Sequence, residues 1–391
     1  MNILRIVYDW PDENVILEGL APAPYELSVS QAKLGHKIYV LCGNLNGKNI
    51  KHGKFNYSLE NGRIEVFNLP RGLSKFGPFL TTSIAVLPFY FYFKFIKKID
   101  LVHNHGHLGV WFLLYKLLFG FLDKTKVIGH YHITAKGREW AIKKQNVKIP
   151  FWAEYFEYPI HKLADHLMSK VCFKLVATSR DVIEEVERYY QIDSSKIILL
   201  ESGVDTARFK KEGQKEDFGF KAGSTIIANG GRLSKRKNID VLVESLRFLP
   251  ENYKLVLWGP WEDSLKKKVD EIILKFNLQD RVKYLGVISY FKVDEYFRAA
   301  DIFVLPSSYE GLPKAVVEAL ASRCKVLASG FRVDKKISDL YFLDKIDPEY
   351  LAERIAYIDR LQLSYKETRG IIEKYYSWDS KAKMLEGIIG S

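Results

Sequence analysis

Residues 301–321 read DIFVLPSSYEGLPKAVVEALA, and this stretch decides the fold class. An apolar run ends at Leu305, a polar loop containing Gly311 follows, and beyond it apolar residues recur at helical spacing. Pro313 is well placed as the first helical residue, because its fixed φ suits a helix start and its missing N–H would be unpaired there. The stretch therefore predicts a strand, a loop and a helix, which is the βα unit of a parallel sheet.

The same pattern recurs along the chain. Short β-branched runs predict strands near residues 2–8, 37–42, 63–69, 100–105, 126–132, 173–178 and 196–200 in the first half, and near 224–230, 254–258, 282–285, 301–306 and 325–329 in the second. Asp205 to Ser224 is rich in Lys, Glu and Gly, which indicates a linker between domains. We therefore predict an α/β protein with two Rossmann-like, doubly wound domains, whose ligands bind beyond the carboxyl ends of the strands.

The composition is that of a folded protein, since 47% of the 391 residues are hydrophobic and 27% are charged. No apolar run reaches the roughly 18 uninterrupted residues that a spanning helix needs, and Met1 leads into a strand without a signal-peptide pattern. We therefore expect a cytoplasmic protein. Cys42, Cys172 and Cys324 have neither zinc-site nor disulfide spacing, so we expect buried, reduced thiols.

The positive charge is confined to one third of the chain. Residues 31–150 hold 19 Lys/Arg and 5 Asp/Glu, a balance of +14, whereas the whole chain carries +12. Such a region can attract phosphates, nucleic acid or an anionic membrane surface, and a solvated lysine-rich face is the alternative. All nine histidines lie between His36 and His166, so any imidazole chemistry must come from the first half.

Two carboxylates flank the predicted helix start in the second half. Glu310 precedes the helix, and Glu318 lies about two turns along it. The free N–H groups and positive dipole end of this helix, next to Gly311, would suit a diphosphate. The two carboxylates would reach hydroxyl groups in different parts of one ligand.

The motif EGLPKAVVEALA, with its Pro-Ser lead-in, resembles the signature of the retaining glycosyltransferases of family 4. The resemblance implies a GT-B fold, in which two Rossmann-like domains face a cleft. It also implies that Glu310 binds hydroxyls of the donor sugar and that Glu318 binds the ribose. Gly311, Leu312 and Pro313 would belong to the same donor site.

A second match is GGRLSKRKN at residues 230–238, directly after a predicted strand. It resembles the family's Gly-Arg-Leu loop with a lysine five residues after the arginine. An Arg fork and a Lys point charge can stabilise a departing diphosphate. The resemblance gives Arg232 and Lys237 this catalytic role and places Gly231 at the donor, while Lys235 and Arg236 receive no role. A generic basic turn is the alternative.

The strand near 126–132 ends in two histidines. The resemblance puts His132 at the active-site position, where it would contact the donor sugar. Because side chains alternate along a strand, His130 should share a face with His132 and is the second candidate. A structural histidine is the alternative for either. His103, His105 and His107 also alternate, but no Asp-x-Asp motif accompanies them, so we predict no metal site.

Weaker matches, such as Asp100 to His105 and Gly203 to Phe209, extend the resemblance over most of the chain. Several loops depart from the family pattern. The Gly-Gly pair after the first strand is absent, the usual Gly-x-Pro reads Ser322-Arg323-Cys324, the Gly-Gly-x-x-Glu loop after Ser329 is missing, and Ser202 replaces an Asn. Donor contacts from these loops are therefore not assumed.

The resemblance implies a metal-independent, retaining hexosyltransferase that uses a nucleotide diphosphate sugar and no cofactor. Residues 1–204 would form the acceptor-side domain and 205–375 the nucleotide-sugar-binding domain, with a helix at 376–391 packing back on the first. The leaving diphosphate would help to deprotonate the acceptor, so no protein nucleophile is needed. A nucleotide-sugar epimerase and a non-catalytic binder of sugar nucleotides or nucleic acid are the alternatives.

The basic first domain points to a glycan, lipid-linked or small anionic acceptor. Lys94, Lys97 and Lys98 lie in or follow the aromatic segment FYFYFKF at residues 89–95. Apolar and cationic groups side by side suit a peripheral membrane helix, although the helical spacing favours core packing of the aromatic residues. We therefore predict reversible attachment to an anionic membrane and do not favour nucleic acid as a partner.

Overall fold

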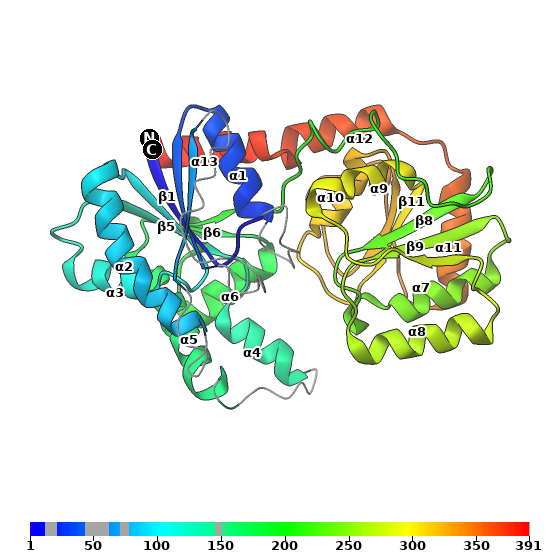
Figure 1. The fold of residues 1–391 in the computed structure, drawn as a ribbon, viewed down its shortest axis with the longest axis horizontal. Helices are drawn as coiled ribbons and strands as arrows, with labels where there is room; N and C mark the ends of the chain where they lie inside the picture. Colours follow the sequence, from blue (N-terminus) through cyan, green and yellow to red (C-terminus); the bar gives the residue numbers. More distant parts are fainter. Residues whose placement is uncertain (12–21, 44–61, 71–77, 145–150, 152, 391) are drawn as a thin grey trace. The chain divides into compact units, whose positions relative to one another are not determined.

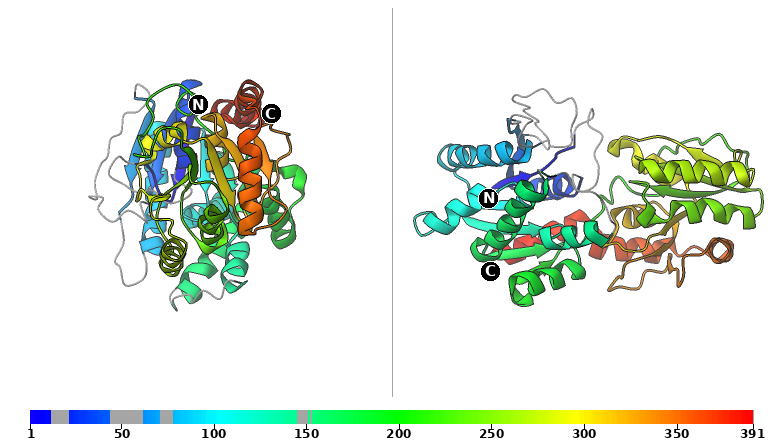
Figure 2. Two further views of the ribbon diagram at one scale, coloured as in Figure 1. Left: turned by 90° about the vertical axis from the view of Figure 1, so that its right-hand side faces the viewer. Right: turned by 90° about the horizontal axis from the view of Figure 1, so that it is seen from below.

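The computed structural model describes residues 1–11, 22–43, 62–70, 78–144, 151 and 153–390. The chain divides into two compact units, Met1–Glu201 and Ser202–Ser391. Each unit contains one parallel β-sheet with helices on both of its faces (Figure 1), and the two further views show the same layering (Figure 2). The predicted α/β, doubly wound fold class is therefore confirmed.

The first sheet has seven parallel strands in the order β3-β2-β1-β4-β5-β6-β7. The strands are β1 (Asn2–Val7), β2 (Lys37–Cys42), β3 (Ile64–Asn68), β4 (Leu101–His105), β5 (Lys126–Tyr131), β6 (Lys174–Ala177) and β7 (Ile197–Leu199). The helices are α1 (Pro22–Lys33), α2 (Pro78–Lys97), α3 (Val110–Phe119), α4 (Ala135–Lys144), α5 (Tyr158–Val171) and α6 (Arg180–Tyr190).

The two faces of the first sheet differ in polarity. One face is apolar, where Leu4 and Val102 belong to the same buried core as Val86 of α2. Because side chains alternate along a strand, the other face carries Arg5 and His103, which lie opposite each other in the register of β1 and β4. Helix α1 covers this second face, since Arg5 donates hydrogen bonds to two of its residues.

Helix α2 is long and apolar enough to cross a membrane by length and composition alone, with a mean hydropathy of 1.5 over Phe79–Lys97. Its residues Val86, Tyr90 and Phe93 are nevertheless fully buried in the core of the first unit. One third of the apolar window is buried in this way, so α2 packs on the core along one side. The helical spacing of the aromatic segment at residues 89–95 favoured core packing, and Tyr90 and Phe93 do pack in the core.

The second sheet has six parallel strands in the order β10-β9-β8-β11-β12-β13. The strands are β8 (Thr225–Gly230), β9 (Tyr253–Trp258), β10 (Val282–Tyr284), β11 (Ile302–Pro306), β12 (Lys325–Ser329) and β13 (Leu340–Phe342). The helices are α7 (Ile239–Ser245), α8 (Asp263–Lys275), α9 (Val293–Ala299), α10 (Lys314–Ala321), α11 (Pro348–Arg360), α12 (Tyr365–Ile371) and α13 (Trp378–Gly390).

Both faces of the second sheet are apolar and covered. Along β11, Phe303 and Leu305 join a core with α9 and α10, whereas Ile302 and Val304 join a second core with α7, α8 and α11. This division explains why the strand reads as a continuous apolar run, since a strand buried on both faces needs no polar residues.

Each predicted strand is present, with ends that shift by about one residue. The three-residue edge strand β13 was not predicted, because Leu340–Phe342 is too short to show a pattern. The cysteines are free, and Cys42 and Cys324 are buried as expected, while Cys172 is partly buried. The prediction that residues 376–391 return to the first domain stays a prediction.

Candidate functional site

Two sequence motifs meet at one edge of the second sheet. Strands β8 and β11 are neighbours, and the chain order reverses between them, so this is the topological switch point at which such domains bind ligands. Residues 230–238 follow β8 and residues 306–313 follow β11. We call these two segments the paired loops.

Hydrogen bonds join the paired loops directly. The N–H of Ser308 donates to the carbonyl of Arg236 at 2.9 Å. Nδ2 of Asn238 donates to the carbonyl of Pro306 at 2.8 Å and to Oγ of Ser308 at 3.0 Å. Segments that are far apart in the sequence therefore form one connected polar cluster.

Glu310 lies at the centre of this cluster. Its Oε2 is 2.7 Å from a guanidinium nitrogen of Arg236, and its Oε1 accepts a hydrogen bond from Oγ of Ser307 at 3.1 Å. Arg236 also donates to the carbonyl of Tyr309. The Glu310 side chain is 14% exposed, so its carboxylate is held in place but can still reach a ligand.

The backbone of Glu310 is fixed by the loop after β12. Its N–H donates to the carbonyl of Gly330 at 2.6 Å. Gly330 has a φ of 86°, and a Cβ on it would lie 2.5 Å from the carbonyl oxygen of Ser307. Only glycine fits this close approach, so the loop that departs from the family pattern still positions Glu310.

Lys237 is the partly buried cation of the site. Its Nζ donates to the carbonyl of Gly230 at 3.2 Å, and burial lowers the pKa of Lys237 to about 8, although the charge of Glu310 opposes this shift. Gly231 has a φ of 94°, and a Cβ on it would lie 3.0 Å from Nζ of Lys237. Gly231 therefore leaves room for the ammonium group, while Arg232 beside it is exposed.

Helix α10 (Lys314–Ala321) begins four residues after Glu310. Pro313 precedes the helix in an extended conformation with ψ of 126°, so the prediction that it is the first helical residue was wrong. Among the described residues, no side chain forms a cap hydrogen bond at the helix start, which leaves its positive dipole end available to an anion. Gly311 and Leu312 connect Glu310 to this helix start, and Leu312 is buried in the apolar core.

Glu318 differs from Glu310 in its surroundings. It is the fifth residue of α10, about one turn from the helix start rather than two, and it is 5% exposed. Its Oε1 lies 2.9 Å from Nζ of Lys314, which in turn donates to the hydroxyl of Tyr290 at 2.7 Å. A ligand hydroxyl would have to share this carboxylate with Lys314.

Sequence reasoning missed two supports of the site. Arg236 received no role, although it pairs with Glu310; its place in a motif with three adjacent basic residues was the available signal. Gly330 was passed over because its loop lacks the family's second glycine. The first loop expected to differ, around residues 18–24, lies largely outside the described residues.

In the first unit, His132 directly follows β5 and is partly buried. Its ring stacks on that of His130, with centroids 4.3 Å apart, so the prediction that they share a face is confirmed. Nε2 of His132 lies 3.1 Å from Nδ1 of His105. Burial lowers the pKa of His132 to about 4, which keeps the imidazole neutral at physiological pH.

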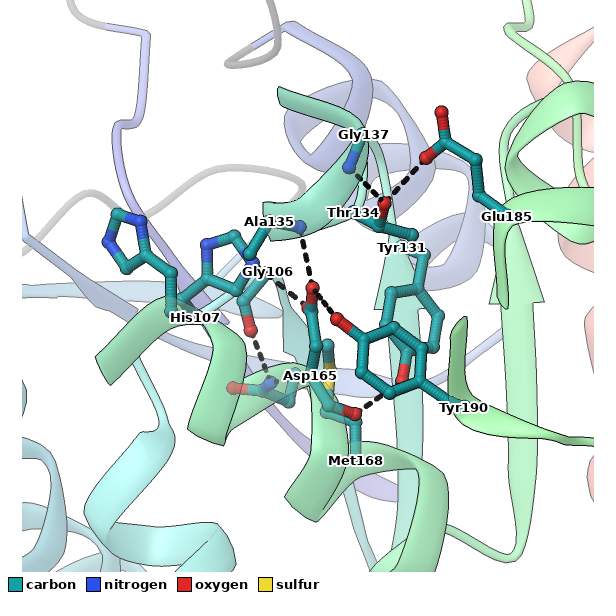
Figure 3. A network of polar contacts seen from close by, with 12 residues as sticks. Gly106, His107, Tyr131, Thr134, Ala135, Gly137, Asp165, Met168, Glu185 and Tyr190 are labelled. Atoms are coloured by element: carbon teal, nitrogen blue, oxygen red, sulfur yellow. Dashed lines mark hydrogen bonds and ion pairs between the residues drawn. The ribbon is translucent and has the colours of Figure 1, made fainter. Parts of the chain in front are cut away.

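His107 belongs to a different network, although it alternates with His103 and His105 in the sequence. Nε2 of His107 contacts Oδ1 of Asp165 at 2.9 Å (Figure 3). The fully buried Asp165 also accepts from the N–H of Ala135 at 2.6 Å and from the hydroxyl of Tyr190 at 2.9 Å through its Oδ2. This network fixes α5 against the segment after β5, and His107 therefore has a structural partner.

Two family profiles divide the chain between them. The profile described as "Glycosyltransferase Family 4" matches residues 19–208, and that described as "Glycosyl transferases group 1" matches residues 210–368. The chain is similar to an uncharacterized glycosyltransferase of Methanocaldococcus jannaschii, with 24% identity over 299 residues, covering 71% of this chain and 81% of that one. The chain is also similar to the mannosylfructose-phosphate synthase of Agrobacterium fabrum, with 25% identity over 59% of this chain. This match covers only 54% of the length of the synthase.

Solved structures share the fold over the whole chain. Sucrose-phosphate synthase from Thermosynechococcus elongatus has a TM-score of 0.73 at 17% identity, covering 100% of this chain and 98% of that one. HepE of Anabaena, solved in complex with UDP-glucose, has a TM-score of 0.68 at 14% identity, covering 100% of this chain and 99% of that one. Both have two-domain folds like that described above.

Proposed function

Because this chain belongs to the group 1 and family 4 glycosyltransferases, with their GT-B fold, we propose that it transfers a sugar from a nucleoside diphosphate sugar to a carbohydrate or lipid-linked acceptor. We further propose retention at the anomeric carbon and no requirement for a metal ion. The observation that carries the proposal is the cluster of Glu310, Arg236 and Lys237 beside the uncapped start of α10.

In this proposal the positive groups stabilise the leaving diphosphate. Its charge increases as the bond between the anomeric carbon and the phosphate oxygen breaks, so groups that are already oriented stabilise the transition state more than the ground state. Arg232, Lys237 and the start of α10 supply this positive charge without a metal ion. The acceptor oxygen forms the new bond on the same face, and its proton passes to the diphosphate.

Glu310 orients the donor sugar by accepting hydrogen bonds from its hydroxyls. Ser307 and Arg236 hold the carboxylate before the sugar arrives, so little orientational freedom is lost on binding. Glu318 accepts from the ribose in this scheme, with Lys314 as its present partner. His132, neutral because of its lowered pKa, would donate or accept a single hydrogen bond at the sugar.

Product analysis with a panel of nucleotide sugars tests the proposal, and UDP-glucose is the first candidate because HepE binds it. Calorimetry identifies the nucleoside diphosphate that binds, and NMR of the product gives the anomeric configuration. A new glycoside with the configuration of the donor is expected, in the presence of EDTA. An epimerised sugar nucleotide formed without acceptor would favour the epimerase, and binding without turnover would favour the non-catalytic binder.

We also propose that the first unit attaches reversibly to an anionic membrane, through a surface that shares only Phe95 and Lys98 with the segment named from the sequence. Lys94 and Lys97 form ion pairs with Asp123 and Glu65, which limits their attraction to lipid. An exposed apolar tip instead combines the ends of α2 and α3. It consists of Phe95, Ile96, Leu117, Leu118, Phe121 and Leu122, which are 51% to 76% exposed.

The apolar tip suits a bilayer because its residues come from two adjacent helices. Phe91 of α2 and Tyr115 of α3 pack with ring centroids 4.9 Å apart, so the two helix ends lie side by side. Lys98 and Lys124 are exposed beside the apolar tip, and each lysine near an anionic surface contributes about 1 kcal/mol. Exposed apolar groups flanked by lysine are the combination that inserts into a headgroup region.

Vesicle sedimentation decides the membrane proposal. The chain should bind vesicles rich in phosphatidylserine, should not bind phosphatidylcholine vesicles, and should dissociate at high salt. Phe121→Ser combined with Leu122→Ser should abolish binding, whereas Leu274→Ser, at an equally exposed apolar residue of α8, should not. Absence of binding to both vesicle types would contradict the proposal and favour a water-soluble acceptor.

A further inference from the structure

Four histidines lie together on one face of the first sheet, at the carboxyl ends of β4 and β5. The ring centroid of His103 lies 4.1 Å from that of His105 and 5.3 Å from that of His130. These three side chains are 1%, 3% and 4% exposed, and His132 lies at the outer end of the group. The function proposed above uses His132 alone.

The three inner histidines have more hydrogen-bonding groups than their surroundings satisfy. Nε2 of His105 and Nε2 of His130 are buried without a hydrogen-bond partner among the described residues. Nε2 of His103 lies 3.3 Å from Nδ1 of His130, and one ligand nitrogen of each residue lies within 4.8 Å of the other two. Because buried polar atoms normally have a partner, the arrangement indicates a ligand that contacts all three rings.

We propose that His103, His105 and His130 bind one transition-metal ion of the Zn²⁺ class. Zinc holds imidazole nitrogens at about 2.0–2.1 Å in a tetrahedral arrangement, which places two such nitrogens about 3.3 Å apart. One candidate nitrogen from each ring lies within 4.8 Å of the other two, so the rings would have to turn to bring these nitrogens to this spacing. Imidazole ligands select zinc, copper or nickel over magnesium and calcium.

One cation lies close to the cluster, because Arg5 is opposite His103 in the register of β1 and β4. Arg5 donates hydrogen bonds to the carbonyl of Pro24 at 3.1 Å and to Gln31. Its positive charge still opposes a dication, so we expect weaker binding than at a zinc site with thiolate ligands.

The ion would lie beside His132 without being needed for the proposed transfer. Nδ1 of His105 contacts Nε2 of His132 at 3.1 Å, so His105 joins the histidine cluster to the residue that the proposed reaction places at the donor sugar. A hydrogen-bonded partner that orients another group is a common arrangement around metal sites. His107 takes no part, because it is bound to Asp165.

Metal titration of the full chain, after dialysis against a chelator, tests this inference without any sugar transfer. One Zn²⁺ per chain should bind in calorimetry, and Co²⁺ should give the intense visible absorption of a tetrahedral site. Zn²⁺ should also raise the Tm of the chain, because it binds the folded state. His103→Gln and His130→Gln should lose all three effects, whereas His166→Gln, an exposed histidine of α5, should keep them.

Circular dichroism identifies variants that fail to fold, and the Co²⁺ spectrum of the unaltered chain remains decisive in that case. Absence of stoichiometric binding by the unaltered chain would overturn the proposal, as would binding that persists in both folded variants. Loss of this site leaves nucleoside diphosphate binding by the second unit unchanged, so its failure is distinguishable from failure of the proposed glycosyl transfer.

Discussion

The carboxyl edges of the two sheets carry different chemistry. In the second unit the polar side chains are charged, lie on loops and stay within reach of water, as Glu310, Arg236 and Lys237 do. In the first unit they are neutral imidazoles, set on strands and buried, as His103 and His130 are. Charged groups on loops can exchange one partner for another when a ligand arrives, whereas buried strand residues are fixed by the fold. We therefore expect the second unit to determine binding and departure of the diphosphate.

The strongest test of this difference is Glu310→Gln. The substitution keeps the size of the side chain but removes the charge that pairs with Arg236, and we expect kcat to fall by about 10²–10³, as when one preorganised group of an active site is lost. Affinity for the nucleoside diphosphate should change little. Steady-state kinetics and calorimetry measure both.

Glu271→Gln is the matched control, since Glu271 is exposed on α8. Equal loss of activity in both variants, or loss of folding in Glu310→Gln alone, would show that Glu310 acts through stability rather than through the donor.

A smaller effect is expected when the support of Glu310 is removed. Arg236→Ala leaves Glu310 with Ser307 as its side-chain partner, so the carboxylate gains freedom, and we expect kcat to fall about tenfold, equivalent to about 1.4 kcal/mol. Arg236→Lys should recover only part of this, because lysine lacks the planar fork. Arg247→Ala, which breaks the ion pair with Glu244, is the control and should have no effect. An unaltered kcat in Arg236→Ala would remove Arg236 from the site.

Donor binding should depend on pH through Lys237. Because burial lowers the pKa of Lys237 to about 8, the ammonium loses its proton above that pH, and the Kd for the nucleoside diphosphate should rise by up to about tenfold per pH unit. Lys237→Arg should flatten the profile. Calorimetry between pH 7 and pH 10 measures it, and a flat profile in the unaltered chain would contradict the assignment.

The lowered pKa of Lys237 weakens donor binding as the pH rises, but it increases the stability of the fold over the same pH range. Between about pH 8 and the ordinary lysine value of 10.5, the unfolded chain holds a proton that the folded chain has released. Stability contributed by Lys237 therefore rises with pH in this window.

The sequence could predict which two segments meet at the edge of the second sheet, because each segment is contiguous. Glu310 to Pro313 and Gly231 to Lys237 are each a short run placed after a strand, and strand ends of a parallel sheet meet at one edge. What it could not predict depends on contacts between segments. The pairing of Arg236 with Glu310 and the cluster of His103 and His105 with His130 require the register of neighbouring strands, which no local pattern encodes.

The apolar tip shows the same limit in the first unit. The aromatic run at residues 89–95 was visible in the sequence, but only the structure separates buried Tyr90 and Phe93 from exposed Phe95. The contribution of Phe121 and Leu122 depends on the packing of α3 against α2. Amphipathic periodicity predicts a face of one helix, whereas this surface is formed by the ends of two.

The smallest expected effect concerns the end of α10, where a departure from the family pattern has a structural cost. Arg323 has a φ of 80°, and its N–H donates to Leu320 at 3.2 Å while that of Cys324 donates to Ala319 at 2.9 Å. These two bonds form the helix ending that normally places glycine in the left-handed position. In the family's Gly-x-Pro pattern, Ser322 stands where the glycine is expected. The backbone shows instead that Arg323 occupies the left-handed position that favours glycine.

Arg323→Gly should therefore stabilise the chain. A left-handed residue with a side chain costs about 1–2 kcal/mol. Glycine is itself disfavoured by about 0.5–1 kcal/mol because of its freedom in the unfolded chain, so the free energy of unfolding should rise by up to about 1.5 kcal/mol. Arg323→Ala separates the two causes, because alanine removes the charge but keeps the strained backbone. Urea denaturation of the three chains measures the effect. If alanine stabilises as much as glycine does, the arginine side chain rather than its backbone conformation is the source of the cost.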